Sequence, residues 1–176
     1  EMCIRDRREY KFMSALQHPH LDTPIDAFQD DGGSAALVMA YPRGKGSWVP
    51  LDLLPSPLTL TAEQQVSLIT QIADGIAYAH QNEITHRNLS PTAVLVDASE
   101  LKHGRINAKV SRWTELGLIG AEQTQQTQLT ALAKSTATAQ DDDFPEFRPP
   151  EGFQSDADKR LGDLYSVAAM AFYIFA

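Results

Sequence analysis

The sequence has little of several features that define whole classes of protein. Cys3 is its only cysteine, so no disulfide can form within the chain, and a reducing compartment is expected. The chain does not open on a basic and then apolar leader. Its longest apolar run, residues 164–176, is too short to cross a bilayer and suits a buried helix. These scarcities predict a cytoplasmic protein without a membrane partner.

Basic residues are also scarce. The 176 residues include 15 Lys and Arg against 23 Asp and Glu, which leaves a net charge of −8. Phosphate-rich surfaces repel an acidic protein, so neither nucleic acid nor an anionic membrane is expected as the main partner. Solubility explains the same charge equally well, so the charge excludes partner classes and identifies none. The composition, with 43% apolar and 22% charged residues, is typical of one globular domain or of a piece of a larger one.

Helical patterns occur at three places in the chain. They predict helices over residues 5–17, over residues 61–81 and from about Asp163 onward. The second is the clearest, because Thr61 and Gln64 can form a capping box and because one stripe of residues recurs with a period of 3.6. The stripe comprises Val66, Ile69, Ile72, Ala73, Ile76, Ala77 and His80.

Short β-like runs lie between these helices, at residues 23–30, 34–41, 93–96 and 106–111. The sequence DDGG between the first two runs favours a hairpin turn. Residues 41–48 contain Pro and two Gly and predict a loop. Residues 117–143 are rich in Gln, Thr, Ala and Asp without a sustained period, which predicts a long mobile loop.

Six short motifs occur in an order that resembles the protein kinase superfamily. They are Glu9 followed by LQHPHL, then ALVMAY, HRNLSPTAVLV, AKVSRWT, RPPE and DLYSVAAMAFY. The resemblance covers nearly the whole chain and implies an α+β, protein kinase-like fold that is incomplete. It would comprise the C-helix and hinge hairpin of the N-lobe (1–41), the hinge (42–47) and the C-lobe up to the F-helix (48–176). The activation segment would cover about 112–151.

The resemblance implies structural roles for seven residues: Glu9, Met13, His86, Arg87, Trp113, Glu151 and Asp163. Met13, His86 and Trp113 would belong to an apolar spine. Asp163 would accept hydrogen bonds from the backbone of the catalytic loop, and an acid at the start of an apolar helix also suits the helix dipole.

The positions that carry the chemistry in kinases are changed. The catalytic base corresponds to Asn88, whose amide cannot take a proton at pH 7, and losing a base costs about 10²–10⁴-fold in rate. Ser90 stands where kinases have a lysine. The two metal-ligand positions hold Ala93, which has no ligand atom, and Arg112, a cation where Mg²⁺ needs hard oxygen donors. We therefore do not expect Mg²⁺ to bind.

The nucleotide positions, by the same resemblance, are Met39, Ala40, Tyr41, Pro42 and Leu95. Pro42 would stand where a backbone N–H usually meets adenine, and proline has none. The lost hydrogen bond is worth roughly 0.5–1.5 kcal/mol. The Gly-rich loop and the strand lysine of kinases are not among these residues, so at most weak ATP binding is expected.

Two functions fit these motifs. The first is a pseudokinase-like module that binds a partner protein and retains weak ATP binding. The alternative is a divergent serine/threonine kinase that transfers the γ-phosphate of ATP to protein hydroxyls. A third interpretation is that these 176 residues are inactive and unstable alone. The form HRxLSPxxVLV also resembles bacterial kinase-like domains of the nuclease-related-domain (NERD) group associated with BREX phage defence.

Overall fold

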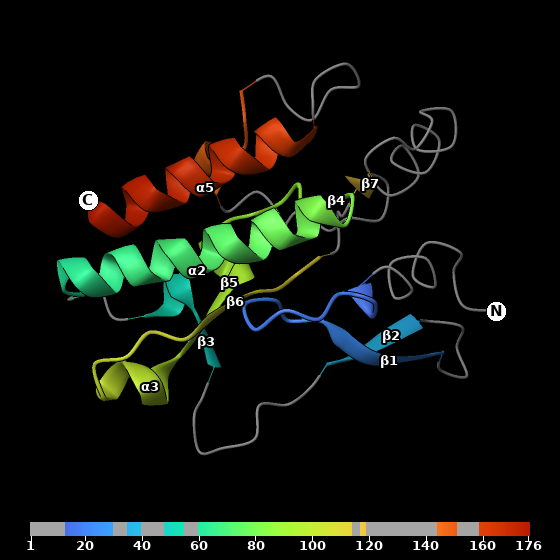
Figure 1. Cartoon of the computed structure of the whole chain (residues 1–176), viewed down its shortest axis with the longest axis horizontal. Coiled ribbons are helices and arrows are strands. Elements are labelled where there is room, and N and C mark those ends of the chain that lie inside the picture. Colours follow the sequence, from blue (N-terminus) through green and yellow to red (C-terminus); the bar gives the residue numbers. More distant parts are fainter. Residues whose placement is uncertain are drawn as a thin grey trace.

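The computed structural model describes residues 13–29, 35–39, 48–54, 60–113, 117–118, 144–150 and 159–176. This part of the chain combines two long helices with three small antiparallel sheets (Figure 1). The mixed α and β architecture agrees with the predicted fold class. The predicted helix over 5–17 lies mostly outside the described residues.

Helix α2 (Ala62–Gln81) is the central element. Its capping box is present: Thr61 Oγ1 accepts from the Gln64 backbone at 3.3 Å, and Gln64 Oε1 accepts from the Thr61 backbone at 2.8 Å. The buried face of the helix includes Leu68, Ile72, Ile76 and Ala79. The predicted helix and its cap are therefore confirmed. The predicted apolar stripe was wrong at Val66 and Ala77, which are exposed.

Helix α5 (Lys159–Phe175) lies beside α2 and runs in the opposite direction (Figure 1). Gln65 near the start of α2 donates to Ile174 O at 2.9 Å, and His80 near its end meets Asp163 at 2.8 Å. The prediction that this helix begins near Asp163 was wrong, since the chain is already helical at Lys159. The sequence pattern missed the first turn because Lys, Arg and Gly carry no apolar period.

A three-stranded sheet packs its apolar face toward α2. Its strands are β3 (Trp48–Pro50), β5 (Val94–Asp97) and β6 (Ala108–Val110), in the order β3-β5-β6. Side chains alternate along these strands, so that Val94, Val96, Ala108 and Val110 are buried, whereas Leu95 and Lys109 are half-buried. The predicted strand runs at 93–96 and 106–111 are confirmed. Trp48, which the Gly- and Pro-rich loop pattern included, lies instead in β3.

Three short helical elements complete this region. The 3-10 helices η1 (Leu51–Leu53) and η2 (Pro91–Ala93) pack together, and α3 (Ala98–Lys102) follows β5. Asp97 caps α3 by accepting from the backbone of Ser99 at 2.9 Å. This helix was not predicted, because five residues are too few for a periodic pattern.

Strands β1 (Pro24–Gln29) and β2 (Ala35–Met39) form the predicted antiparallel hairpin, and the DDGG turn lies outside the described residues. Strand β4 (Ile84–Thr85) pairs with β7 (Gly117–Leu118). The expected loop over 117–143 was therefore wrong at its first two residues, which a distant strand recruits. The remainder of that loop lies outside the described residues.

The segment before β1 is held between α2 and β6. Val110 N donates to His20 O at 2.9 Å, and Asp22 N donates to Val110 O at 2.8 Å. Helix α2 approaches this segment at Gly75, where a Cβ atom would lie 2.9 Å from His20 O and 3.1 Å from a methyl group of Leu21. Only glycine fits here without a shift of the backbone.

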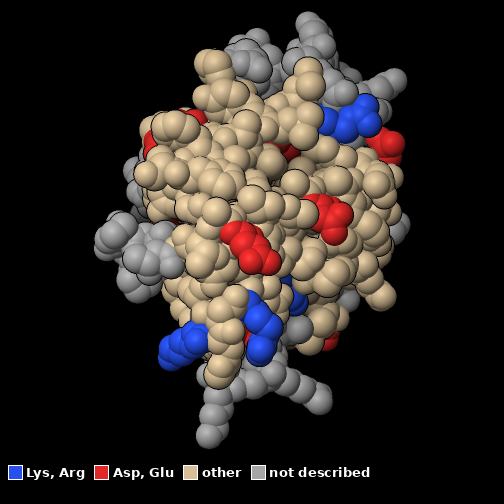
Figure 2. Space-filling view, turned by 60° about the vertical axis from the view of Figure 1, so that its left-hand side comes forward, with Lys and Arg blue, Asp and Glu red and all other residues tan. Residues whose placement is uncertain are grey.

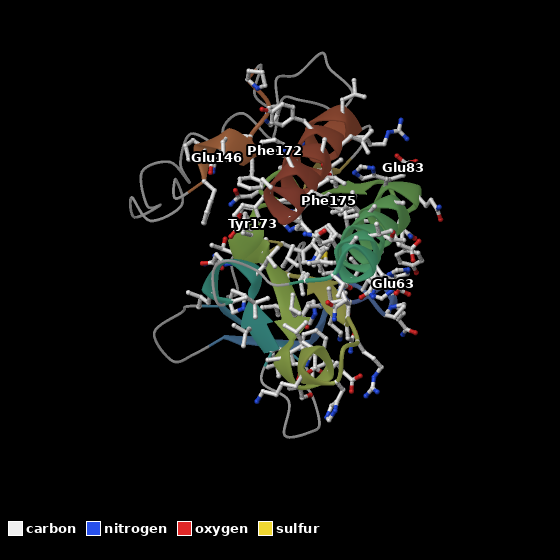
Figure 3. All side chains as sticks on the ribbon, turned by 90° about the vertical axis from the view of Figure 1, so that its left-hand side faces the viewer. Glu63, Glu83, Glu146, Phe172, Tyr173 and Phe175 are labelled. Atoms are coloured by element: carbon white, nitrogen blue, oxygen red, sulfur yellow. The ribbon has the colours of Figure 1, made fainter. Side chains whose placement is uncertain are left out.

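Several apolar side chains of α5 are exposed in the described part of the chain. They are Leu161, Leu164, Tyr165, Phe172, Tyr173 and Phe175. Figure 3 shows the last three gathered at the C-terminal end of the helix. On the face drawn in Figure 2, charged side chains are scattered among uncharged ones. None of the described helices is both long enough and apolar enough to cross a membrane.

Candidate phosphoryl-transfer site

The segment 86–93, which the resemblance assigns to the catalytic loop, is anchored to α5 by one carboxylate. Asp163 is fully buried, and its two oxygens accept from His86 N at 2.8 Å and from Arg87 N at 2.7 Å. The Nε2 atom of His80 lies 2.8 Å from the same carboxylate. These are the backbone hydrogen bonds that the resemblance implied for Asp163.

The side chain of His86 joins this loop to the end of β6. Its Nδ1 accepts from Asn88 N at 3.3 Å, so the proton of the neutral ring lies on Nε2, which donates to Ser111 O at 2.8 Å. The centroid of the His86 ring lies 4.5 Å from the centroid of the Trp113 ring. Burial lowers the pKa of His86, although the Asp163 carboxylate and the Ser111 carbonyl act in the opposite direction. His86 therefore serves as a neutral packing and bracing residue.

Two arginines near the loop adopt left-handed backbone conformations. Arg87 has φ of 66° and Arg112 has φ of 59°, a region that residues with a side chain seldom occupy. The hydrogen bonds of Asp163 hold the first of these turns. Such conformations cost of order 1–3 kcal/mol each and are concentrated at functional sites.

The four residues that the resemblance assigns to catalytic positions are all described. Asn88 is half-buried, and its Oδ1 accepts from Arg148 Nη2 at 3.4 Å. Ser90 Oγ lies 2.9 Å from Thr92 Oγ1, so the two hydroxyls form a hydrogen bond. Ala93 is buried, and its carbonyl accepts from both the backbone and the hydroxyl of Ser111. Arg112 is exposed.

These side chains do not fit a magnesium ion at the two family positions. Ala93 offers a methyl group, and Arg112 brings a positive charge, whereas Mg²⁺ takes oxygen ligands. In the described ranges, no three His, Cys, Asp or Glu side chains come together as a metal site. The side chains of Ala93 and Arg112 therefore offer no ligand atom for Mg²⁺.

The nucleotide positions are described only in part. Leu95 is half-buried in β5, where it pairs with Lys109 of β6 and Pro50 of β3. The Lys109 ammonium lies 5.5 Å from the ring centroid of Trp48. Burial raises the pKa of Asp22, and the Lys109 charge opposes this shift. Leu95, which the resemblance assigns to the nucleotide site, thus has the cation Lys109 as its neighbour on β6.

The remaining residues of the predicted structural and nucleotide sets are buried, described only in their backbone, or outside the described residues. Met13 and Trp113 are buried in one core cluster. The backbone of Met39 ends β2. Glu9, Ala40, Tyr41, Pro42 and Glu151 lie outside the described residues.

The sequence and the fold find counterparts among known proteins. The family model described as "Protein kinase domain" matches residues 2–176, which is nearly the entire chain. The chain belongs to the protein kinase family. The predicted resemblance to that superfamily is therefore confirmed.

Individual kinases match at moderate identity. The serine/threonine-protein kinase pkn2 of Myxococcus xanthus is 33% identical over 98 residues, which cover 56% of this chain and 11% of pkn2. Serine/threonine-protein kinase PknH of Mycobacterium bovis is 26% identical over 167 residues, covering 94% of this chain and 24% of PknH. The chain thus spans less than a quarter of the length of these relatives.

A solved structure supports the fold. A chain of the yeast RNA Pol II CTD kinase CTDK-1 complex matches with a TM-score of 0.69 at 17% identity. The match covers 99% of this chain and 50% of that one. The described architecture is therefore that of a partial kinase domain, as the sequence predicted.

Sequence reasoning missed three residues that hold this candidate site together. His80 was assigned only to the apolar stripe of α2, yet it meets Asp163. Ser166 Oγ donates to Phe147 O at 2.7 Å, and Arg148 contacts Asn88. A serine inside an apolar helix was the one available signal, because a buried hydroxyl needs a partner. The partners of His80 and Arg148 depend on contacts between distant segments.

Proposed function

We propose that this chain is part of a catalytically impaired kinase-like domain that acts as a regulatory or protein-interaction module. One observation carries the proposal: the loop keeps its kinase scaffold, while its chemical positions hold Asn88, Ser90, Ala93 and Arg112. The contacts of His86 and Asp163 keep the loop in one conformation that a partner protein could bind. The four substitutions remove the groups that would take part in phosphoryl transfer.

Phosphoryl transfer requires an oriented hydroxyl, positioned phosphates and charge stabilisation. The Asn88 amide accepts no proton at neutral pH, and the Ser90 hydroxyl carries no charge. A positioned base alone is worth about 10²–10⁴-fold in rate. Since several such groups are replaced together, a compensating change at one position would leave the others deficient.

The proposal includes weak, metal-independent ATP binding. Leu95 keeps an apolar side chain at the expected adenine position, which supports binding. Ala93 and Arg112 at the metal positions argue against a role for Mg²⁺. The division into a partial N-lobe (1–41), a hinge (42–47) and a partial C-lobe is part of the same hypothesis.

We also propose a protein as the partner and the cytoplasm as the location. The net charge of −8 disfavours nucleic acid and anionic membranes as partners, and one cysteine suits a reducing compartment. The narrower relationship to NERD kinases of BREX phage defence remains a hypothesis that rests on the form of the HRNLSPTAVLV motif.

The second candidate is a divergent serine/threonine kinase. The names of the relatives favour it, since both pkn2 and PknH are serine/threonine-protein kinases. In that case, phosphate and metal groups would come from residues outside the described ranges. The intact contacts of His86 and Asp163 are compatible with either function.

Two measurements on the full-length protein separate these candidates. The first is transfer of labelled γ-phosphate from ATP with Mg²⁺, either to the protein itself or to a generic protein substrate. We expect no transfer above that of a matched Asn88→Leu variant. Transfer that this variant abolishes would establish the kinase instead.

The second measurement is the thermal shift with ATP, with and without Mg²⁺. A ligand at 100 times its Kd stabilises the native state by about 2.7 kcal/mol. A shift that does not depend on Mg²⁺ is the expected result. A shift only with Mg²⁺ would mean that metal ligands exist elsewhere, and it would contradict the proposed metal-independent binding.

A further inference from the structure

The edge of β6 that faces away from β5 is completed partly by side chains. Each backbone N–H and C=O group along a buried edge needs a hydrogen-bond partner. Val110 finds its partners in the backbone before β1, since its N–H donates to His20 O at 2.9 Å and its carbonyl accepts from Asp22 N at 2.8 Å. At Ile106 and Ala108, by contrast, the partners are side chains.

Gln71 of α2 makes two of these side-chain hydrogen bonds. Its Oε1 accepts from Ala108 N at 2.8 Å, and its Nε2 donates to Ile106 O at 3.0 Å. A residue of a neighbouring parallel strand would bond the same two groups, because it pairs with the N–H and the C=O of residues two positions apart. The Gln71 amide therefore takes the place of one strand residue.

The orientation of the Gln71 amide is determined by both of its partners. A backbone N–H only donates and a backbone carbonyl only accepts, so the two ends of the amide cannot be exchanged. Ser67 Oγ, one helical turn earlier, accepts from the same Nε2 at 3.2 Å. Leu68 and Ile72 beside it are buried in the core. The side chain is thus a fixed link between α2 and β6.

Strand β6 leads directly into the candidate site. Ser111, the next residue, donates to Ala93 O from its backbone N–H at 2.8 Å and from its hydroxyl at 3.1 Å. The Ser111 carbonyl accepts from His86 Nε2 at 2.8 Å. The Trp113 indole donates to Val110 O at 3.3 Å. The position at which β6 ends therefore determines where these groups of the site meet.

Only a short stretch of strand separates the Gln71 contact from the site. Ser111 follows Ala108 by three residues, which span about 10 Å in an extended strand. Ala108 and Val110 are fully buried, and β5 pairs with β6 along the other edge. A close-packed strand cannot absorb a shift at its start, so a displacement at Ala108 is passed on to its end.

We propose that Gln71 is a positioning residue of the candidate site, because its amide replaces a strand at the edge of β6 and so fixes Ser111 and Trp113. The inference goes beyond the function proposed above and does not depend on it, since β6 has the same place whether or not phosphate is transferred. A role limited to its own two partners would affect Ile106 and Ala108 and leave Ser111 unchanged.

Gln71→Met removes both hydrogen bonds at similar side-chain length. Amide hydrogen exchange of Ser111 in the full-length protein should accelerate about tenfold, because the strand opens more readily without them. The ¹⁹F signal of 5-fluorotryptophan at Trp113, identified by its loss in Trp113→Phe, should shift. Gln65→Met is the matched control, since Gln65 donates from the same helix to Ile174 O on α5, and it should change neither signal.

Gln71→Glu tests the chemistry of the amide at nearly constant shape. At pH 7 the introduced carboxylate still accepts from Ala108 N, but it has no donor for Ile106 O. A protonated carboxyl group both donates and accepts, so the neutral form fits and its pKa in the folded variant should exceed the unfolded value of about 4.3. The loss of stability relative to the wild type should therefore be present at pH 7 and shrink as the pH falls through the folded pKa. Gln71→Met has no such group, and its loss should not depend on pH.

Three results would overturn the proposal. The first is a Gln71→Met variant in which exchange accelerates at Ala108 while Ser111 keeps its wild-type rate. The second is equal acceleration at Ser111 in Gln71→Met and Gln65→Met, which would indicate a general loss of stability. The third is a Gln71→Glu variant whose difference from the wild type is the same at about pH 7 and pH 4.5. This variant carries the test where Gln71→Met does not fold.

The proposed function fails on a different result. Labelled phosphate transfer by the wild-type protein would refute an impaired kinase and leave the role of Gln71 intact. Conversely, an unaltered Ser111 in Gln71→Met would refute this role and leave the proposed function untouched.

Discussion

Replacement of Asp163 by asparagine tests whether one carboxylate holds the catalytic loop. The two carboxylate oxygens receive the backbone N–H groups of His86 and Arg87, and His80 contacts the same group. Asparagine has one oxygen and one amino group in the same volume. In either orientation, therefore, at least one backbone N–H faces another donor.

The expected cost follows from this geometry. If the asparagine oxygen takes the place of Oδ2, it still serves His86 N, but Arg87 N loses its acceptor. A lost hydrogen bond to a charged group is worth about 1.5–3 kcal/mol, and the buried donor left behind costs about 1–3 kcal/mol. Because these two values partly describe the same loss, their sum is an upper limit, and Asp163→Asn should lower the free energy of unfolding by about 2–4 kcal/mol.

Urea denaturation of the full-length protein measures this change. Asp74→Asn is the matched control, because the Asp74 side chain is 63% exposed and lies 3.5 Å from His18 Nε2. An exposed pair of this kind contributes about 0–1 kcal/mol. Amide hydrogen exchange at His86 and Arg87 should also accelerate in Asp163→Asn alone. Equal destabilisation by the two substitutions would refute the reasoning that Asp163 anchors the loop.

Three further perturbations have defined outcomes. Gly75→Ala should lower stability by about 1–2 kcal/mol in thermal or urea unfolding, because the added Cβ meets His20 O, although alanine favours the helix; a stabilised variant would contradict this close approach. Thr61→Ala should cost about 1 kcal/mol, and an unchanged urea midpoint would show that the cap is dispensable. The pKa of His86 is lowered from 6.5 by burial, so the unfolded state binds its proton first as pH falls below about 6.5. The free energy of unfolding should therefore decline as the pH falls below about 6.5, and His86→Gln should reduce this pH dependence. An unaltered pH dependence would exclude His86 as its source.

The sequence was sufficient where structure depends on neighbouring residues. The apolar period and the Thr61 cap specify α2, and short β-like runs predict the β1–β2 hairpin and strands β5 and β6. The short elements β3, α3, β4 and β7 were not predicted. They have few residues each, so neighbours in space, and not a local period, determine their conformation.

The candidate site divides in the same way. The identities of Asn88, Ala93 and Arg112 are legible in the sequence, because a missing carboxylate is a property of the side chain itself. The orientation of the Asn88 amide is not, since its partner Arg148 lies 60 residues away. Likewise, His80 and Asp163 are 83 residues apart and meet only because α2 and α5 pack antiparallel. Local sequence thus determined which chemical groups the site contains, and only tertiary packing decided which of them meet and which way they face.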